Sequence, residues 1–371
     1  MLKKFTVTNF KNFENTITFD LSHPANYEFN NEIIKNNCVT KGIIYGINGS
    51  GKSNLGLAIF DIVFHLTDKE KLYDKYLFYK NMDSSKTTVD FEYLFLFRGI
   101  EVLYRYRKVS AEILVYESLI INGEEVLSYD FASQEGYSKL EGSENMQLNS
   151  GLMTNLNTLS RVKYIKSNAI LADNEINRAF MDFVTFADNM LLFYSLDQNR
   201  YQGFYLGMDS YTQGIIRENK INEFECFLRD QGIDYHLVVS LLNGQQELFC
   251  QFSHGMAPFS SVASTGTRSL ALFYYWYLKM NSASFVYIDE FDAFYHFELS
   301  QTLVELVKRL ENTQVYLSTH NTDLLSNDIL RPDAFFQIIN NKIYSFDQLT
   351  EKELRRAHNI QKMYKAGTFN E

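Results

Sequence analysis

Apolar and polar residues alternate over two long stretches of the chain, which is the period of β-strands with one buried face. Residues 2–20 alternate in this way and predict two strands that turn near residues 11–12. Residues 87–129 contain several such runs, separated by glycine-containing turns at 98–99 and 122–123. The second stretch therefore predicts an antiparallel β-meander.

Short, continuous apolar runs predict strands that are buried on both faces, as in a parallel sheet. Such runs occupy Phe285 to Ile288 and Val315 to Leu317, and a further strand is predicted over Thr40 to Tyr45, directly before a glycine-rich loop. After that loop, apolar residues recur at helical spacing, so a helix is predicted over Gly51 to Leu66. A further helix is predicted over residues 266–280. Both ends of the chain thus indicate strand, loop and helix units around a parallel sheet.

The middle of the chain is less regular than its ends. Helices are predicted over 174–195 and 216–231, and strands resume over 234–253. We therefore expect an α/β protein with a mixed or parallel central sheet flanked by helices, an antiparallel β-subdomain and a helical insertion. The predicted regions are an N-terminal lobe over 1–130, a mostly helical insertion over 131–255 and a C-terminal lobe over 256–371.

Composition limits the classes of protein that fit this pattern. The 371 residues are 46% hydrophobic and 22% charged, which excludes a disordered or purely coiled-coil chain. The 35 Lys and Arg residues stand against 45 Asp and Glu residues, so the net charge of −10 argues against a generally basic surface that coats nucleic acid. A local basic groove is compatible with these numbers.

Cysteine usage and hydropathy indicate a cytoplasmic protein. Cys38, Cys226 and Cys250 are widely spaced and form no C-x-x-C pair, so neither a disulfide framework nor a zinc cluster is predicted. The first residues are broken by polar side chains, and the longest apolar-rich run, Leu270 to Met280, is too short to cross a bilayer. We expect no membrane association.

The glycine-rich loop carries the first candidate chemistry. Gly46 to Ser53 satisfies G-x-x-x-x-G-K-[ST] between a predicted strand and a predicted helix, so a chance match is a weak alternative. Backbone N–H groups of such a loop cradle phosphates, the lysine reaches the β- and γ-phosphates, and the following hydroxyl group ligates Mg²⁺. A bound nucleoside triphosphate is therefore predicted. Its expected contacts are Gly46, Asn48, Gly49, Ser50, Gly51, Lys52, Ser53 and Asn54, of which Lys52 is also a catalytic candidate and Ser53 a metal ligand.

Two adjacent acids follow the buried strand that begins at Phe285. Asp289 is predicted to hold the Mg²⁺ shell, and Glu290, which points in another direction, is predicted to polarise the attacking water as a general base. The alternative is that both acids merely cap the strand. Their position after four apolar residues favours the catalytic interpretation.

A histidine follows the next buried strand. Strand Val315 to Leu317 ends in Ser-Thr-His320, where an imidazole can donate a hydrogen bond to the γ-phosphate. Most lone histidines are structural, and we expect this of His23, His65, His236 and His254. His320 is a catalytic candidate because parallel strands end at one edge of the sheet.

Small hydroxyl residues surround a glycine just before the helix predicted over 266–280. Ser264, Thr265, Gly266 and Thr267, followed by Arg268, can form an anion site at a helix N-terminus, although taken alone they favour a plain helix cap. Their position between the P-loop and the acidic strand favours nucleotide contact.

In this order the elements resemble the ABC-type ATPase head shared by SMC, RecF and OLD-like ATPases. In particular they resemble the RloA-type group of small bacterial AAA ATPases associated with phage defence and abortive infection. Phe297 stands where that group has a proline. The segments that carry the resemblance are Asn9 to Phe13, Gly46 to Ser53, Ser264 to Arg268, Asp289 to Phe297, Ser318 to Leu325, Leu330 to Asp333 and Tyr364 to Gly367.

The resemblance implies an Mg²⁺-dependent ATPase that works as a homodimer or higher homo-oligomer. In such a dimer Thr265 and Gly266 contact the γ-phosphate held by the partner, and Asp292 lies in the D-loop across the interface. The resemblance also implies a role in antiphage defence as an ATP-gated sensor or scaffold. Because the sequence has no D-x-D and no nuclease motif, nuclease or toxin activity is expected in a separately encoded effector protein.

Two other functions fit parts of the sequence. A RecF-like repair ATPase would bind nucleic acid through a basic groove, although runs of charge are more often solvated faces. The candidates for that groove are Lys3, Lys4, Lys11, Arg105, Arg107 and Lys108. An ATP-held structural clamp with slow turnover is the second alternative, and the presence of Glu290 argues against it.

Overall fold

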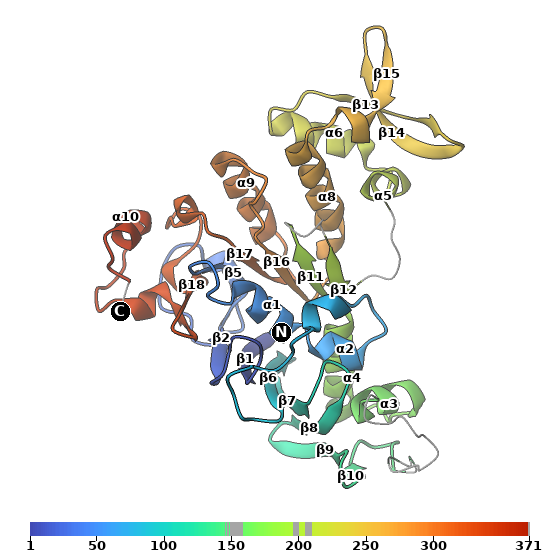
Figure 1. Ribbon diagram of the computed structural model, residues 1–371, viewed down its shortest axis with the longest axis vertical. Coiled ribbons are helices and arrows are strands. Elements are labelled where there is room, and N and C mark those ends of the chain that lie inside the picture. The colour runs from blue at the N-terminus through green and yellow to red at the C-terminus, as the bar shows by residue number, and fades with distance from the viewer. Residues whose placement is uncertain (145, 147, 149–158, 196–199, 205–209, 370–371) are drawn as a thin grey trace.

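A largely parallel sheet forms the centre of the computed structural model, which describes residues 1–144, 146, 148, 159–195, 200–204 and 210–369 (Figure 1). Its strand order is β12-β11-β16-β17-β5-β18-β19, and the inner five strands are parallel. The apolar runs predicted as buried strands lie in this sheet, because both of its faces are covered. The strands are β5 Lys41–Tyr45, β11 Met190–Tyr194, β12 Tyr201–Gly203, β16 Phe285–Asp289, β17 Gln314–Ser318, β18 Phe335–Ile339 and β19 Lys342–Ser345.

A second sheet is entirely antiparallel and contains the predicted β-meander. Its order is β10-β9-β8-β7-β6-β1-β2, so the first two strands of the chain extend the meander at one edge. Alternating burial along β6 and β7 follows the alternating sequence pattern. The strands are β1 Leu2–Thr8, β2 Ile17–Asp20, β6 Val89–Phe97, β7 Ile100–Lys108, β8 Leu114–Ile121, β9 Glu124–Asp130 and β10 Glu135–Ser138.

The two large sheets are joined through the hairpin β1–β2. The ring of Phe19 lies 5.1 Å from that of Tyr316 and 5.0 Å from that of Phe336, both in the central sheet. Gln314 exchanges two hydrogen bonds with the backbone of Leu2. The main apolar core therefore lies between the sheets.

A small three-stranded sheet projects from one end of the molecule together with α5, α6 and α8 (Figure 1). It consists of β13 His236–Leu242, β14 Gln245–Phe252 and β15 Gly255–Pro258. The short pair β3 Ile34–Lys35 and β4 Cys38–Val39 completes the strands of the described residues. The α-helices are α1 Lys52–Ile59, α2 Ile62–Leu66, α3 Arg161–Asn168, α4 Glu175–Asp188, α5 Tyr211–Arg217, α6 Ile221–Asp230, α7 Phe259–Val262, α8 Thr265–Met280, α9 Phe297–Lys308 and α10 Ile360–Lys365.

The middle of the chain differs from its prediction in two respects. The predicted helix over 216–231 is divided, because α5 ends at Arg217 and α6 begins at Ile221. The region 131–255 contains helices α3 to α6, but β11 and β12 of the same region belong to the central sheet. The predicted helix over 174–195 ends at Asp188, because the apolar run Met190–Tyr194 pairs with β16 instead of continuing the helix. The region is thus not a purely helical insertion. Where a domain boundary falls stays a prediction.

The single helix predicted over residues 51–66 is divided into α1 and α2. The last carbonyl groups of α1 accept hydrogen bonds from tyrosine hydroxyls: Tyr76 bonds to Leu57, and Tyr93 to Ala58 and Ile59. These tertiary bonds replace helical ones, so the chain turns at residues 60–61 before α2 begins. The helical spacing of apolar residues in the sequence does not reveal such an interruption.

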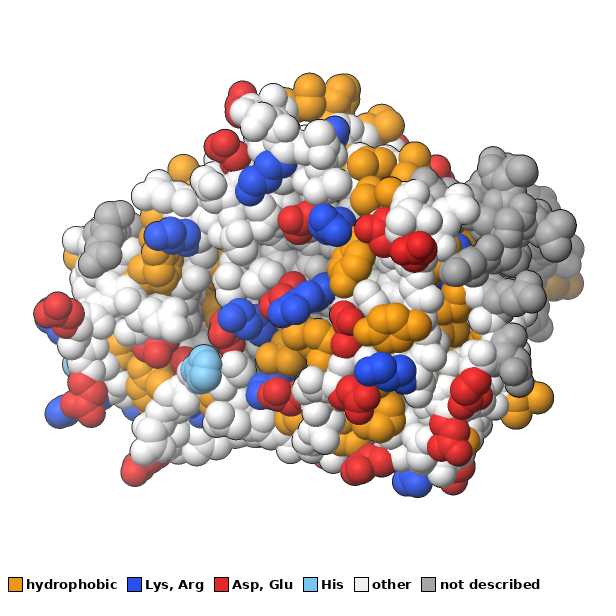
Figure 2. Space-filling model, turned by 90° about the horizontal axis from the view of Figure 1, so that it is seen from below, with side chains coloured by type: hydrophobic (Ala, Val, Ile, Leu, Met, Phe, Trp, Pro, Cys, Tyr) orange, Lys and Arg blue, Asp and Glu red, His pale blue; other side chains and the backbone are white. Residues whose placement is uncertain are grey.

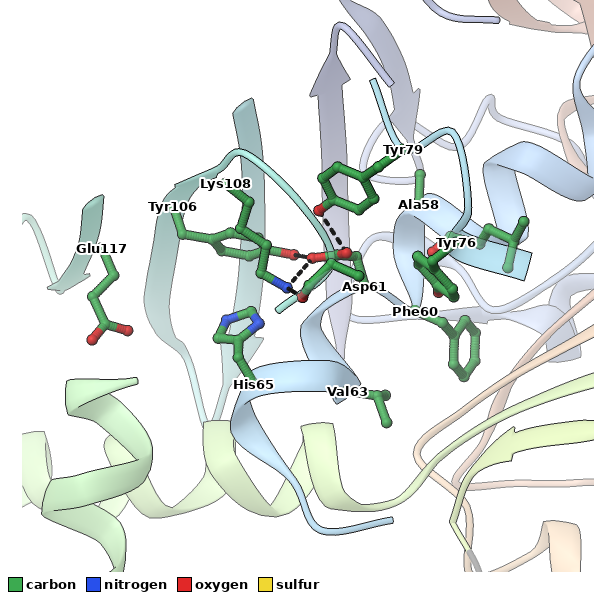
Figure 3. Close-up of polar contacts among 12 residues, drawn as sticks. Ala58, Phe60, Asp61, Val63, His65, Tyr76, Tyr79, Tyr106, Lys108 and Glu117 are labelled. Carbon is green, nitrogen blue, oxygen red and sulfur yellow. Dashed lines mark hydrogen bonds and ion pairs between the residues drawn. The ribbon is translucent and has the colours of Figure 1, made fainter. Parts of the chain in front are cut away.

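Asp61 lies at this turn in a fully buried polar cluster (Figure 3). Its carboxylate accepts hydrogen bonds from Lys108 at 2.7 Å, Tyr79 at 2.7 Å and Tyr106 at 2.9 Å. Burial lowers the pKa of Lys108, and the Asp61 carboxylate opposes that shift. The cluster ties the helix after the glycine-rich loop to the meander.

Removing one member of the buried ion pair between Asp61 and Lys108 should destabilise the protein strongly. Lys108→Met leaves the Asp61 carboxylate buried without a counterion, so we expect the free energy of unfolding, measured by urea denaturation, to fall by about 3–5 kcal/mol. The double variant Asp61→Asn/Lys108→Met should lose less than the two single changes added together. The control Lys139→Met breaks an exposed ion pair with Glu124 and should cost less than about 1 kcal/mol. Equal losses for Lys108→Met and Lys139→Met would contradict the role of the buried pair.

Candidate functional site

The glycine-rich loop joins β5 to α1 at the carboxyl edge of the central sheet. Gly49 and Gly51 have φ angles of 79° and 106°, which glycine adopts without strain. No side chain caps α1, so the N–H groups of its first turn are available to an anion. The Ser50 hydroxyl is buried and has no hydrogen-bond partner. The loop therefore has the donors that phosphate binding requires.

Asn12, on the turn between β1 and β2, supports this loop. Its side-chain amide nitrogen donates to the Ser50 carbonyl at 3.4 Å, and its oxygen accepts from Asn54 at 2.6 Å. A Cβ atom at Gly51 would lie 2.7 Å from both Asn12 and Phe13. The sequence indicated residues 9–13 only through family resemblance and assigned no site role to Asn12. Two asparagines far apart in the sequence give no signal of their contact.

Lys52 lies between the loop and the tip of β17. Its ammonium group donates to the Gly46 carbonyl at 2.9 Å and to Nε2 of His320 at 2.8 Å. Burial lowers the pKa of Lys52, whereas Asp289 and Glu290 oppose the shift. Phosphate oxygens would be stronger acceptors than either present partner, because they carry charge.

His320 is positioned to accept this hydrogen bond in its neutral form. Burial is the largest cause that lowers the pKa of His320, and the Lys52 ammonium group adds to it. Nε2 of His320 also lies 3.9 Å from a carboxylate oxygen of Glu290. The histidine thus contacts groups from two other loops of the site.

The two adjacent acids after β16 point in different directions. Glu290 has a φ angle of 50°, and its N–H donates to the Ser318 hydroxyl at 2.9 Å. That hydroxyl donates to Asp289 at 2.5 Å and holds its carboxylate at the sheet edge. A left-handed conformation is uncommon for a residue other than glycine, asparagine or aspartate, and here it turns Glu290 away from Asp289.

A cavity of about 470 Å³ lies over the glycine-rich loop and has the size of a small-molecule site. Most of the predicted loop residues line it together with two of the predicted catalytic residues. Its lining residues are Asn48, Gly49, Gly51, Lys52, Ser53, Asn54, Glu290 and His320.

One hydroxyl and one carboxylate are available for Mg²⁺. Ser53 lines the cavity, while Asp289 is largely buried beneath it and acts electrostatically on Lys52. Oxygen ligands of this kind, completed by water and phosphate, suit Mg²⁺. Within the described ranges, no group of three or more His, Cys, Asp and Glu side chains could hold a metal ion.

The segment Ser264–Arg268 is placed elsewhere, at the N-terminus of α8. Ser264 caps this helix and accepts from the N–H of Thr267 at 3.1 Å. Thr265 is exposed, and none of these five residues is among those that line the cavity over the P-loop. Arg268 donates to the Ser260 carbonyl and the Thr265 hydroxyl, and it forms no ion pair with another described residue. Ser264, Thr265 and Arg268 are therefore exposed outside the cavity, whereas Thr267 is buried.

Asp292 lies on the turn after Glu290. Its carboxylate accepts a hydrogen bond from the Thr319 hydroxyl at 2.7 Å, which joins this turn to the residue before His320. Burial raises the pKa of Asp292. In this chain Asp292 thus supports the histidine loop, and the predicted contact across an interface stays a prediction.

The candidates for a basic groove are largely occupied. Lys108 is fully buried against Asp61, so its inclusion in a surface groove was wrong. Arg105 pairs with Glu92 at 2.6 Å, and Lys3 with Glu101 at 3.0 Å. On the face in Figure 2, basic side chains lie among acidic ones. These contacts do not favour a nucleic-acid groove.

Fold and site together define a P-loop α/β fold of the ABC-ATPase head type. One strand, β17, separates the loop strand β5 from the acidic strand β16, and all three end at the cavity. Residues 216–326 match the family model described as "AAA domain, putative AbiEii toxin, Type IV TA system". The match includes Ser264–Arg268, the acidic pair and His320, and it supports an ABC-type ATPase.

Solved structures with a similar arrangement are heads of SMC proteins. The SMC head domain from Thermotoga maritima is 15% identical with a TM-score of 0.46, over 93% of this chain and 98% of that one. An Smc head bound to the C-winged helix domain of ScpA is 14% identical with a TM-score of 0.43, over 93% and 97%. An Smc head bound to the C-terminal domain of ScpA from Pyrococcus furiosus is 14% identical with a TM-score of 0.42, over 93% and 96%.

Comparison with curated proteins found no relative. Within the described residues, no helix combines the length and apolar character needed to cross a membrane. All three cysteines are free, as their spacing predicted.

Removing the Asn12 side chain should weaken nucleotide binding without unfolding the protein. Asn12→Ala removes the hydrogen bonds to Ser50 and Asn54, each worth about 0.5–1.5 kcal/mol, so we expect the Kd for ATP to rise about tenfold. The measurement is isothermal titration calorimetry. Asn168→Ala, an exposed change on α3, should leave the Kd unchanged. Unaltered ATP binding by Asn12→Ala would show that the loop holds its shape without this support.

The lowered pKa of His320 should appear in the pH dependence of ATP hydrolysis. The ordinary pKa of a histidine side chain is 6.5, and because that of His320 is lowered, its ring is still mainly neutral at this pH. We therefore expect kcat/KM to stay constant from neutral pH to about 6.5. At lower pH, protonation removes the acceptor for Lys52 and places a second positive charge beside it, so kcat/KM should fall. His320→Gln should be slower and lack this acidic decline. His23→Gln, at an exposed histidine, should keep the wild-type profile. If kcat/KM of His320→Gln falls at acidic pH as in wild type, the decline is due to another group.

Proposed function

We propose that the protein is an Mg²⁺-dependent ATPase that binds and hydrolyses ATP. The observation that carries this proposal is the convergence of Lys52, Glu290 and His320, from three separate loops, on the cavity over the P-loop. A passive nucleotide site needs no carboxylate at this position. The separation of Glu290 from Asp289 instead supports a division between water activation and metal binding.

Each group has a role that follows from its charge and position. Lys52 neutralises the phosphates, and Glu290 accepts the proton of the attacking water. Ser53 and Asp289 would hold Mg²⁺, which would supply positive charge to the phosphate oxygens. His320 holds the Lys52 ammonium group before the nucleotide binds and is near enough to contact the γ-phosphate afterwards.

We also propose that ATP joins two copies of the chain, or a larger homo-oligomer. Within the Ser264–Arg268 segment, Ser264, Thr265 and Arg268 are exposed at a helix N-terminus, outside the cavity of their own chain. A second copy can supply this segment to the cavity, with Thr265 and Gly266 facing the γ-phosphate and Asp292 beside the interface. Binding would then close the dimer, and hydrolysis would release it.

The proposed biological role is bacterial antiphage defence. In it the ATPase acts as an ATP-gated sensor or scaffold for a separately encoded effector, a nuclease or toxin. The description of the matched family, which refers to an AbiEii toxin and a type IV toxin–antitoxin system, supports this role. The effector would respond to whether the ATPase dimer is closed.

Replacing Glu290 should separate ATP binding from hydrolysis. Glu290→Gln keeps the size of the side chain but removes the general base, so we expect phosphate release to fall about 100-fold or more while ATP still binds. In light scattering, the mass of this variant should at least double when ATP and Mg²⁺ are added, relative to its own nucleotide-free state.

The matched control is Glu298→Gln, which changes an exposed acid in the first turn of α9. It should behave as wild type in phosphate release. Equal turnover and equal mass of wild type and Glu290→Gln under all conditions would refute the catalytic assignment.

A further inference from the structure

Strand β13 is an unusual sheet edge in this protein. It forms one edge of the three-stranded sheet and pairs with β14 over seven residues without a register shift. Its sequence, His-Leu-Val-Val-Ser-Leu-Leu, contains no Lys, Arg, Asp, Glu or Pro. A long, regular and uncharged edge strand offers unpaired N–H and C=O groups to any other strand.

The other edges of the three larger sheets are protected in the described residues. Strands β2, β10 and β19 are only four residues long, and each carries one charged residue. Strand β12 has three residues, and β15 ends in proline. Short length, charge and proline are the features that prevent pairing between edges. These edges are β2 (Ile-Thr-Phe-Asp), β10 (Glu-Gly-Tyr-Ser), β12 (Tyr-Gln-Gly), β15 (Gly-Met-Ala-Pro) and β19 (Lys-Ile-Tyr-Ser). β13 departs from this pattern in length and in charge.

The C-terminal half of β13 is also apolar and exposed. Val239 is 38% exposed, Leu241 68% and Leu242 41%. The N–H of Leu237 faces away from β14, because it donates to the side chain of Glu225 on α6. By the alternation of a strand, the N–H and C=O groups of Val239 and Leu241 face the same open side.

We propose that β13 pairs antiparallel with β13 of a second copy of this chain, so that the two small sheets become one sheet of six strands. The occupant is a second copy because the strand is complementary to itself. A two-fold axis at Ser240 places Val239 of each copy opposite Leu241 of the other, which gives two apolar cross-strand pairs and no opposed charges. This pairing needs no nucleotide, so it is independent of the proposed ATP-held dimer.

The two interfaces together would have a structural consequence. The β13 contact lies in the projecting sheet, whereas the ATP contact involves the P-loop cavity (Figure 1). A chain with two different two-fold contacts forms assemblies larger than a dimer when both are made. ATP would then convert β13-paired dimers into a larger homo-oligomer.

The first test is the mass of the nucleotide-free protein by light scattering over a range of micromolar concentrations. Wild type should approach twice the mass of one chain. Leu241→Lys places a charge at the open edge and should shift the protein to the mass of one chain. Gln246→Lys is the matched control, because Gln246 is exposed and lies opposite Leu241 on β14, away from the open edge of β13. A monomeric wild type, or equal masses for both variants, would overturn the proposal.

The second test fixes the register and does not depend on a disruptive change. In a Cys226→Ser background, which removes the exposed native thiol, Ser240→Cys should form a disulfide-linked dimer under mild oxidation. Residues that face each other at a non-hydrogen-bonded antiparallel pair have Cα atoms about 4.5 Å apart, within the range of a disulfide. Val238→Cys should not form a disulfide-linked dimer, because in this register residue 238 lies opposite Leu242 of the second copy. Absence of the Ser240→Cys crosslink, or equal crosslinking of both variants, would overturn the pairing.

Discussion

Helix α1 is held between the two large sheets by tyrosine hydroxyl groups that bond to its carbonyl oxygens. Tyr287 on β16 donates to the carbonyl of Lys52 at the start of the helix. Tyr76 and Tyr93 donate to carbonyls of its last turn. Buried backbone oxygens must be satisfied, so these bonds fix where the helix starts and where it ends. The P-loop is attached to this helix, and its geometry depends on them.

The electrostatics of the site follow from burial more than from the number of charges. Burial lowers the pKa of both Lys52 and His320, and their contact at 2.8 Å keeps the ring neutral. Asp289 and Glu290 oppose the shift on Lys52 from the neighbouring strand end. The left-handed conformation of Glu290 separates two carboxylates that follow each other in the sequence. A charged triphosphate can therefore replace the present acceptors of Lys52, the Gly46 carbonyl and the His320 ring, which carry no charge.

Much of the fold could be predicted from local patterns. The alternating runs of the meander and the apolar runs of the central sheet became strands, because each pattern reports which faces are buried. The helix over 51–66 and the helix over 174–195 were wrong in extent, since their interruptions depend on hydroxyl groups and on a strand partner elsewhere in the chain. Lys108 was grouped with the solvated cations Arg105 and Arg107, yet it shares the buried register of Tyr104 and Tyr106 and pairs with Asp61 in the core.

The sequence by itself determined the chemical groups of the site: the glycine-rich loop with Lys52, the two acids after an apolar strand, and the histidine after the next one. Spacing and hydrophobic pattern suffice for these, because the ends of parallel strands meet at one edge of a sheet. Only the tertiary structure decided that Asn12 supports the loop, that Ser264–Arg268 lies outside the cavity of its own chain, and that β13 is an open edge among the described residues. Each of these depends on distances between segments far apart in the chain, and local sequence patterns contain no information about such distances.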